Sequence, residues 1–192
     1  MIAIVKYNAG NTRSVQNALL RLRYDSVVTD DVQTLISAEK VIFPGVGEAS
    51  SAMFYLQERG LDLVIKNLTQ PVLGICLGLQ LLCSETEEGN TKCLGVFENK
   101  VRRFKETDIV PHMGWNDINS LQGELYTGVN AGDDMYFVHS YYADLSERTT
   151  AICDYITPFS ASLKKDNFYA TQFHPEKSAE RGEKVLLNFL EL

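Results

Sequence analysis

The stretch Pro71-Val72-Leu73-Gly74-Ile75-Cys76-Leu77-Gly78-Leu79-Gln80 decides the fold. Its first half, Pro71–Ile75, is a short, continuous apolar run, which is typical of a strand buried on both faces of a parallel sheet. A helical pattern begins directly after Cys76, and glycines stand two residues before and two residues after this cysteine. The spacing predicts a nucleophile elbow, a tight strand-to-helix turn in which bulkier neighbours would clash. We therefore expect an α/β fold with a thiol at the end of a central strand.

The order of strands and helices differs on the two sides of this stretch. Before Pro71, strands are expected at Ile2–Tyr7, Ser26–Thr29 and Lys40–Phe43, and helices at Thr12–Tyr24, 48–58 and Leu61–Leu68. After Gln80, the extended segments are Gly95–Phe104, Asp134–Tyr141, Thr149–Ile156, Phe159–Leu163 and Phe168–Phe173, with a final helix at Ser178–Leu190. Strands that alternate with helices imply a parallel sheet, and consecutive strands imply antiparallel additions. The sequence thus predicts one α/β domain over residues 1–192, with a mainly parallel open sheet, flanking helices and additional antiparallel strands in the second half.

Composition excludes several classes of protein. Hydrophobic residues make up 45% and charged residues 22% of the 192 residues, as in ordinary globular proteins and unlike disordered or fibrous chains. The net charge of −7 argues against a broad nucleic-acid surface. No apolar run is long enough for a membrane span, and no leader precedes the first strand, so we expect a cytoplasmic protein without membrane association.

The four cysteines, Cys76, Cys83, Cys93 and Cys153, are expected to be reduced thiols in such a compartment. No metal-binding spacing of cysteines or histidines occurs, so the sequence predicts no metal site, and it gives no sign of a cofactor.

A thiol nucleophile needs a base, and the base needs a group that orients it. The segment Phe173-His174-Pro175-Glu176 offers both. In an extended segment, residues i and i+2 point to the same side, so the Glu176 carboxylate can hold the His174 ring while its other nitrogen faces the thiol. Cys76, His174 and Glu176 are therefore the predicted catalytic triad.

These two segments resemble the class I (triad) glutamine amidotransferases, and the resemblance extends over essentially the whole chain. It implies a flavodoxin-like fold and the release of ammonia from glutamine through a γ-glutamyl thioester on Cys76. Three further segments are similar to the glutaminase subunits of imidazole glycerol phosphate synthases. They are Phe43-Pro44-Gly45-Val46-Gly47, Pro111-His112-Met113-Gly114-Trp115-Asn116 and Tyr136-Phe137-Val138-His139-Ser140-Tyr141.

The second resemblance implies a partner and a pathway. Such subunits form a heterodimer with a separate cyclase of β/α-barrel fold, which uses the ammonia to make imidazole glycerol phosphate and aminoimidazole carboxamide ribotide in histidine biosynthesis. The chain departs from the family at Lys6-Tyr7-Asn8, where an Asp-Tyr-Gly-like run is expected.

The resemblance also implies the glutamine-binding residues. Gln80 and Glu88 match positions that hold the α-amino and carboxylate end of glutamine, and His139, Ser140 and Tyr141 match a strand end that presents backbone groups to the substrate. His139 is thus a positioning residue and not the base. Gly45, Val46 and Gly47 match a strand that forms part of the oxyanion hole, although a simple turn explains the two glycines equally well. The backbone N–H of Leu77, directly after the thiol, is expected to help hold the oxyanion.

Two segments have more than one interpretation. A tryptophan in a glycine-containing loop, as at Pro111–Asn116, favours a core position, whereas the resemblance implies a surface that faces the partner. The basic cluster Lys100, Arg102, Arg103 and Lys105 is expected to be a solvated strand with no assigned function.

Other functions stay open at this point. The glutaminase subunits of anthranilate, aminodeoxychorismate or pyridoxal phosphate synthases share the elbow and the His-Pro-Glu segment but not Pro111–Asn116. An inactive, amidotransferase-like binding subunit is a second alternative, and the intact triad argues against it. A cysteine peptidase on a similar fold matches poorly.

Overall fold

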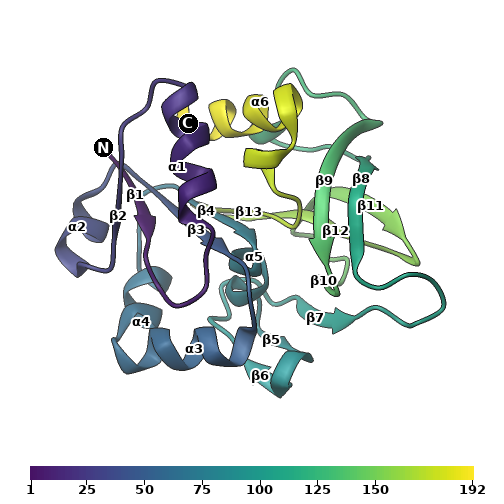
Figure 1. The fold of residues 1–192 in the computed structure, drawn as a ribbon, viewed down its shortest axis with the longest axis horizontal. Coiled ribbons are helices and arrows are strands. Elements are labelled where there is room, and N and C mark those ends of the chain that lie inside the picture. Colours follow the sequence, from purple (N-terminus) through teal and green to yellow (C-terminus); the bar gives the residue numbers. More distant parts are fainter.

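A seven-stranded sheet forms the centre of the computed structural model, which describes residues 1–192 (Figure 1). Its strand order is β11-β12-β13-β4-β3-β1-β2. The parallel strands are β1 (Ile2–Val5), β2 (Ser26–Thr29), β3 (Lys40–Gly45), β4 (Val72–Cys76) and β13 (Phe168–Thr171). The antiparallel strands β11 (Thr149–Tyr155) and β12 (Thr157–Lys165) continue the sheet beyond β13. The predicted α/β class, mainly parallel with added antiparallel strands, is confirmed.

Helices cover both faces of this sheet. One face carries α1 (Thr12–Arg21) and α6 (Ala179–Leu190), and the other carries α3 (Ala49–Glu58), α4 (Leu61–Lys66) and α5 (Leu77–Leu82) (Figure 1). Strand β1 shows how the strands serve both faces. Ala3 and Val5 belong to the core under α3–α5, whereas Ile2 and Ile4 belong to the core under α1 and α6. A strand with two buried faces reads as a continuous apolar run, as the sequence does here.

Two smaller sheets are built from the middle of the chain. The first has the order β10-β7-β5-β6 and contains β5 (Glu85–Thr86), β6 (Thr91–Lys92), β7 (Lys100–Arg103) and β10 (Tyr141–Ala143). The second is an antiparallel ribbon of β8 (His112–Ile118) and β9 (Asp133–His139). Short 3₁₀ turns lie at Glu88–Asn90, Glu124–Tyr126 and Pro175–Lys177. No helix combines the length and the apolar character that crossing a bilayer requires.

Several element boundaries differ from the sequence-based expectation. The first helix ends at Arg21 and not at Tyr24, because Arg23 takes a left-handed conformation with φ of 65°. A short helix, α2 (Val32–Ser37), was not predicted, although Asp31 caps it by accepting a hydrogen bond from the Thr34 N–H. Within Gly95–Phe104, only Lys100–Arg103 forms a strand.

The segment expected as one strand at Asp134–Tyr141 is divided in two. Strand β9 ends at His139 and pairs with β8, whereas β10 begins at Tyr141 and pairs with β7. Ser140 lies between them and belongs to neither. The chain therefore changes sheets at Ser140, whose carbonyl oxygen accepts a hydrogen bond of 3.0 Å from the Phe104 N–H.

Candidate active site

Cys76 lies at the junction of β4 and α5 in a strained backbone conformation, with φ of 55° and ψ of −108°. Positive φ is rare for a residue other than glycine and marks functional sites. The flanking glycines make the turn possible. A Cβ on Gly78 would overlap the Phe43 carbonyl group, and a Cβ on Gly74 would meet the Leu82 side chain and the Gly78 backbone. The predicted nucleophile elbow is present.

The His174 and Glu176 side chains form a buried pair close to this turn. Strand β13 pairs with β4, with Thr171 opposite Ile75, so the residues after β13 reach the end of the strand that carries Cys76. The Nδ1 atom of His174 lies 2.9 Å from Oε1 of Glu176, and each side chain is only 2% exposed.

The local reason for this contact differs from the prediction. Pro175–Lys177 forms a 3₁₀ turn and is not extended. The turn folds the Glu176 carboxylate back onto the imidazole of His174, as the short distance between them requires. The predicted contact exists, but the extended geometry used to predict it was wrong.

The charge of the neighbours favours a protonated His174. Burial alone would lower the pKa of His174, but the adjoining Cys76 sulfur and the Glu176 carboxylate raise it to about 10. Nδ1 is occupied by Glu176, and Nε2 is buried without a hydrogen-bond partner. Nε2 is thus the ring nitrogen left for exchange of a proton with the thiol.

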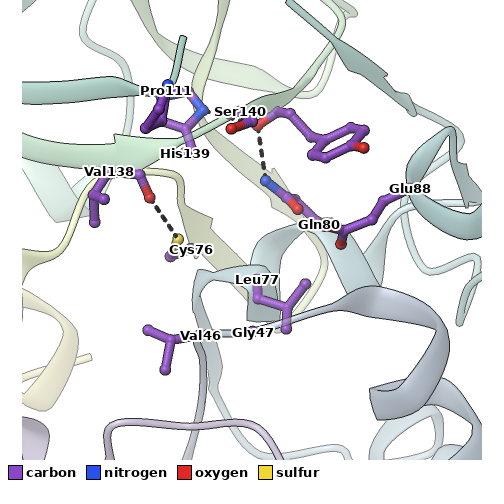
Figure 2. Close-up of a pocket in the computed structure, with 11 residues that line it drawn as sticks. Val46, Gly47, Cys76, Leu77, Gln80, Glu88, Pro111, Val138, His139 and Ser140 are labelled. Carbon is purple, nitrogen blue, oxygen red and sulfur yellow. Dashed lines mark hydrogen bonds between the residues drawn. The ribbon is translucent and has the colours of Figure 1, made fainter.

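A pocket of about 360 Å³ opens next to Cys76 (Figure 2). Nine of the residues singled out from the sequence line it, namely Val46, Gly47, Cys76, Leu77, Gln80, Glu88, His139, Ser140 and Tyr141. Gly45 does not line the pocket but stands beside Cys76 in the pairing of β3 with β4. The structure therefore brings together residues from four separate segments of the chain around one thiol.

The far side of the pocket is polar. Nε2 of Gln80 donates a hydrogen bond of 2.8 Å to the Tyr141 carbonyl oxygen, and Figure 2 shows Gln80 and Glu88 on the same side of the pocket. Oε2 of Glu88 accepts a hydrogen bond of 2.8 Å from the Ala49 N–H. Burial raises the pKa of the Glu88 carboxyl group. A carboxylate at this end suits a ligand with an ammonium group.

The chain matches the family model described as glutamine amidotransferase class-I over residues 3–192. It belongs to the class I glutamine amidotransferases.

Curated relatives of this amidotransferase carry a more specific name. The "Imidazole glycerol phosphate synthase subunit HisH" of Bacteroides fragilis is 59% identical, with 100% of this chain and 99% of that protein covered. The protein of the same name from Bacteroides thetaiotaomicron is 57% identical, with 100% of this chain and 99% of that protein covered. The one from Haemophilus influenzae is 44% identical, with 99% of this chain and 96% of that protein covered.

Solved structures agree on the fold of this amidotransferase. A structure described as a glutamine amidotransferase superposes with a TM-score of 0.77 at 20% identity, covering 99% of this chain and 97% of the other. PurLQS from Thermotoga maritima superposes with a TM-score of 0.73 at 16% identity, with the same coverage.

Two histidines of the amidotransferase form a directed chain of hydrogen bonds that ends at the pocket. His139 Nδ1 faces the Tyr141 carbonyl oxygen at 2.8 Å, so it carries a proton and leaves Nε2 as an acceptor. His112 Nδ1 therefore donates to His139 Nε2 at 3.0 Å, and the Asn116 amide donates to His112 Nε2 at 3.2 Å. Both rings are neutral in this arrangement. The positioning role predicted for His139 stays a prediction, and no role was predicted for its neighbours His112 and Asn116.

Burial keeps these rings uncharged. It lowers the pKa of His112 to about 4, and it lowers that of His139, together with the nearby His112 and His174, to about 3. The base predicted from the sequence, His174, has the opposite shift.

The remaining predictions concern the surface. Pro111–Asn116 does not form a loop, since His112–Ile118 is strand β8, and Trp115 is not in the core, since it is 54% exposed. The basic cluster lies on and just after β7 and is solvated, as expected, with Lys100 paired to Glu85 at 2.7 Å.

All four cysteines are free thiols, and no cluster of three or more histidine, cysteine or acidic side chains is arranged for a metal ion. Gln172 was also missed, although its amide contacts the Cys76 sulfur.

Proposed function

We propose that this chain is the glutaminase subunit of an imidazole glycerol phosphate synthase. The observation that carries the proposal is the thiol of Cys76 at the elbow, with the buried His174–Glu176 pair beside it. The relatives named as HisH subunits match the chain over its full length. We further propose that residues 1–192 act as one glutamine amidotransferase domain.

The proposed reaction proceeds in two stages. His174 accepts the thiol proton, and the Cys76 sulfur attacks the side-chain amide carbon of glutamine. The tetrahedral intermediate collapses to a γ-glutamyl thioester when His174 returns the proton to the nitrogen, which leaves as ammonia. Water then attacks the thioester with His174 as the base, and glutamate and the free thiol are released. Glu176 holds the imidazole in the required tautomer throughout.

The pocket supplies the remaining groups. We assign the oxyanion to the backbone N–H of Leu77 and to the Gly45–Gly47 segment, which faces the thiol from β3. We assign the α-amino and carboxylate end of glutamine to Gln80 and Glu88, with the α-ammonium group at the Glu88 carboxylate. His139 and Ser140 fix the strand end that carries Tyr141. No metal or cofactor is needed for this chemistry.

The partner in this proposal is a cyclase of β/α-barrel fold, bound one to one. It would take the ammonia and convert a phosphoribulosyl precursor to imidazole glycerol phosphate and aminoimidazole carboxamide ribotide in histidine biosynthesis. The exposed side chains of Met113 and Trp115 on β8 offer an apolar surface for it. We place the pair in the cytoplasm, where the four free thiols are the expected form.

The experiment measures glutamate and ammonia released from glutamine by the chain alone, with a cyclase subunit, and with that cyclase and its nucleotide substrate. Formation of imidazole glycerol phosphate from glutamine in the last mixture is the expected result. Stimulation by an anthranilate, aminodeoxychorismate or pyridoxal phosphate synthase instead would move the chain to another acceptor. If no γ-glutamyl thioester formed in any mixture, the chain would be a binding subunit without glutaminase activity.

A further inference from the structure

Gln172 lies directly beside the reacting sulfur, although it belongs to neither the elbow nor the predicted triad. It follows strand β13, whose parallel pairing with β4 places Thr171 opposite Ile75. One residue further along the two chains, Gln172 therefore lies beside Cys76. The Gln172 side chain is completely buried, and its Nε2 lies 3.7 Å from Sγ of Cys76.

The hydrogen bonds of Gln80 fix which way the Gln172 amide points. Gln80 Nε2 donates to the Tyr141 carbonyl oxygen at 2.8 Å and to Oε1 of Gln172 at 3.1 Å. The Gln172 oxygen is therefore occupied by a donor, and its N–H group is directed at the sulfur. If the Gln172 amide were flipped, its NH₂ group would face the NH₂ group of Gln80, and two hydrogen-bond donors would meet.

The Cys76 sulfur thus has one contact suited to each of its protonation states. The Val138 carbonyl oxygen, at 3.8 Å, accepts the S–H of the neutral thiol. The Gln172 N–H can only donate, so it favours the anionic sulfur. A donor at this place helps both when the thiolate attacks and when the sulfur leaves the thioester.

We propose that Gln172 is a further catalytic residue, whose amide N–H stabilises the Cys76 thiolate while its carbonyl oxygen links the nucleophile to Gln80 in the substrate pocket. The inference rests on the proposed glutaminase function. The side-chain amide has no partners other than Cys76 and Gln80, so no structural requirement elsewhere in the molecule explains its burial.

The test follows the thiol itself. Native protein is treated with iodoacetamide between pH 5 and 9 without glutamine, and the rate of S-alkylation at Cys76 is measured by mass spectrometry; the thiolate displaces iodide, so the rate follows the thiolate fraction. All four cysteines are buried, but burial raises the pKa of Cys93 and Cys153 to about 12 and that of Cys83 well above its usual range, so these three hold little thiolate between pH 5 and 9. The titratable groups that line the pocket are Glu88, His139 and Tyr141, and those that act electrostatically with Cys76 or through its neighbour are Tyr7, His174 and Glu176. They are unchanged in the variants.

Two variants remove the donor in different ways. Gln172→Glu keeps the shape and adds a negative charge, and Gln172→Met keeps the approximate volume without charge. The control is Gln70→Glu, the same change at a partly buried glutamine whose amide donates to the Leu35 carbonyl oxygen at 2.7 Å, away from the pocket. Glutamine hydrolysis by the complex with the cyclase is measured in parallel.

We expect Gln172→Glu to raise the midpoint pH of alkylation by about one unit or more, because a like charge next to a thiolate disfavours it. Gln172→Met should raise it by less, and Gln70→Glu should leave it unchanged. The kcat for glutamine should fall roughly tenfold or more in Gln172→Glu, with a smaller change in KM.

An unmoved midpoint in either folded Gln172 variant overturns the proposal, even when the hydrolysis rate is lower, because a purely structural role would not change thiolate formation. Gln172→Met decides the matter if Gln172→Glu does not fold. Because alkylation needs neither glutamine nor a partner, the midpoint is readable even if the wild-type protein proves to have no glutaminase activity. The two proposals can therefore fail separately.

Discussion

The three triad side chains contribute unequally at the scale of single residues. In the proposed reaction, Cys76 forms the bond to glutamine and exchanges its proton with His174, whereas Glu176 acts only through its 2.9 Å contact with His174 Nδ1. A base is harder to replace than the group that orients it, and losses within a triad are not additive.

We therefore expect Cys76→Ala and His174→Ala each to lower glutamine hydrolysis by about three orders of magnitude or more, and Glu176→Gln to lower it by roughly 10- to 100-fold. Steady-state kinetics of the complex with the cyclase measures all three. The reaction driven by added ammonium should survive in each variant. If His139→Ala were more damaging than His174→Ala, the base would be misassigned.

The protonation of His174 depends on the neighbouring sulfur, which gives a second prediction. With its pKa raised above the unfolded value of about 6.5, the protonated ring stabilises the fold fully below that pH, and this contribution is lost as the pH rises through about 10. In Cys76→Ala the sulfur no longer raises this pKa. NMR titration of the His174 ring should therefore find a lower pKa in Cys76→Ala than in the wild type; equal values would mean that the two groups do not interact.

The triad could be predicted from the sequence because each part has a local signature: glycines around Cys76, and His174 two residues before Glu176. Gln172 and His112 could not, because their meaning comes from partners far along the chain. Gln172 meets Cys76 only through the pairing of β13 with β4, and His112 meets His139 only through the pairing of β8 with β9. An isolated polar residue carries no mark of such a partner.

At the scale of elements, the ribbon of β8 and β9 holds its two histidines neutral, and acid should weaken it. Their pKa values in the fold lie below the unfolded value of about 6.5, so the unfolded chain binds more protons below that pH. Stability should then fall as the pH drops from about 6.5 towards 4, by roughly 3 kcal/mol from His112 alone.

Thermal unfolding followed by circular dichroism between pH 4 and 7 tests this prediction. His112→Gln does not titrate in this range and keeps an N–H donor for His139. Its melting temperature should fall less steeply with acid than that of the wild type. Parallel curves would mean that protonation of His112 does not limit stability.

The segment after β3 depends on the backbone freedom of Gly47. Its φ is +119°, a conformation that residues with a side chain rarely adopt, while a Cβ there would meet only the Ala9 side chain at an ordinary 3.5 Å. We expect Gly47→Ala to act on backbone geometry and not on space, and to lower the cyclase-stimulated rate of hydrolysis more than the basal rate, by about 10²-fold if one oxyanion donor is lost. This difference between the two rates arises if the peptide of Val46, which has a glycine on each side, rotates so that its N–H faces the thiol only when the partner is bound. Equal losses in both rates would argue against this rotation.

Tyr7 contacts the strand end that precedes this segment. Its hydroxyl donates a hydrogen bond of 2.7 Å to the Pro44 carbonyl oxygen. Tyr7 is the residue that Lys6-Tyr7-Asn8 shares with the expected Asp-Tyr-Gly-like run, and its buried ring lies against the end of β3.

Elements with a regular apolar period were predictable, and those with mixed patterns were not. The buried strands β1, β3 and β4 read as apolar runs. Strand β8 alternates the buried His112 with the exposed Met113, carries a glycine and exposes Trp115, so its sequence resembles a loop. Only the antiparallel pairing with β9 makes it a strand.

At the scale of the whole molecule, the surface carries large apolar side chains in more than one place. Met113 and Trp115 are 67% and 54% exposed on β8, and Phe54 is 66% exposed on α3. Exposed aromatic side chains are frequent energetic centres of interfaces.

We expect Trp115→Ala to weaken binding of the cyclase subunit by about tenfold or more, with little change in melting temperature. Isothermal titration calorimetry measures the affinity. Phe54→Ala is the matched control, since it removes an equally exposed aromatic ring from a helix on the other side of the sheet, and it should bind normally. A larger effect of Phe54→Ala would place the partner on α3.

The overall arrangement followed from the sequence, because alternation of strands and helices allows few parallel topologies. The strand order did not. Nothing in residues 168–171 alone indicates that β13 enters the sheet between β4 and β12. The place of β13 in the sheet depends on the burial of both its faces, and only the assembled core provides that burial.

Strand β13 follows its neighbour β4 by many residues in the sequence, and this has a consequence for the chain while it is being synthesised. A ribosome makes Cys76 well before Gln172, His174 and Glu176. Until those last residues emerge, the nascent chain carries a thiol without a base and a sheet with an empty place beside β4. A translation product that stops short of residue 168 therefore lacks the means to break down glutamine, so abandoned synthesis releases no stray ammonia.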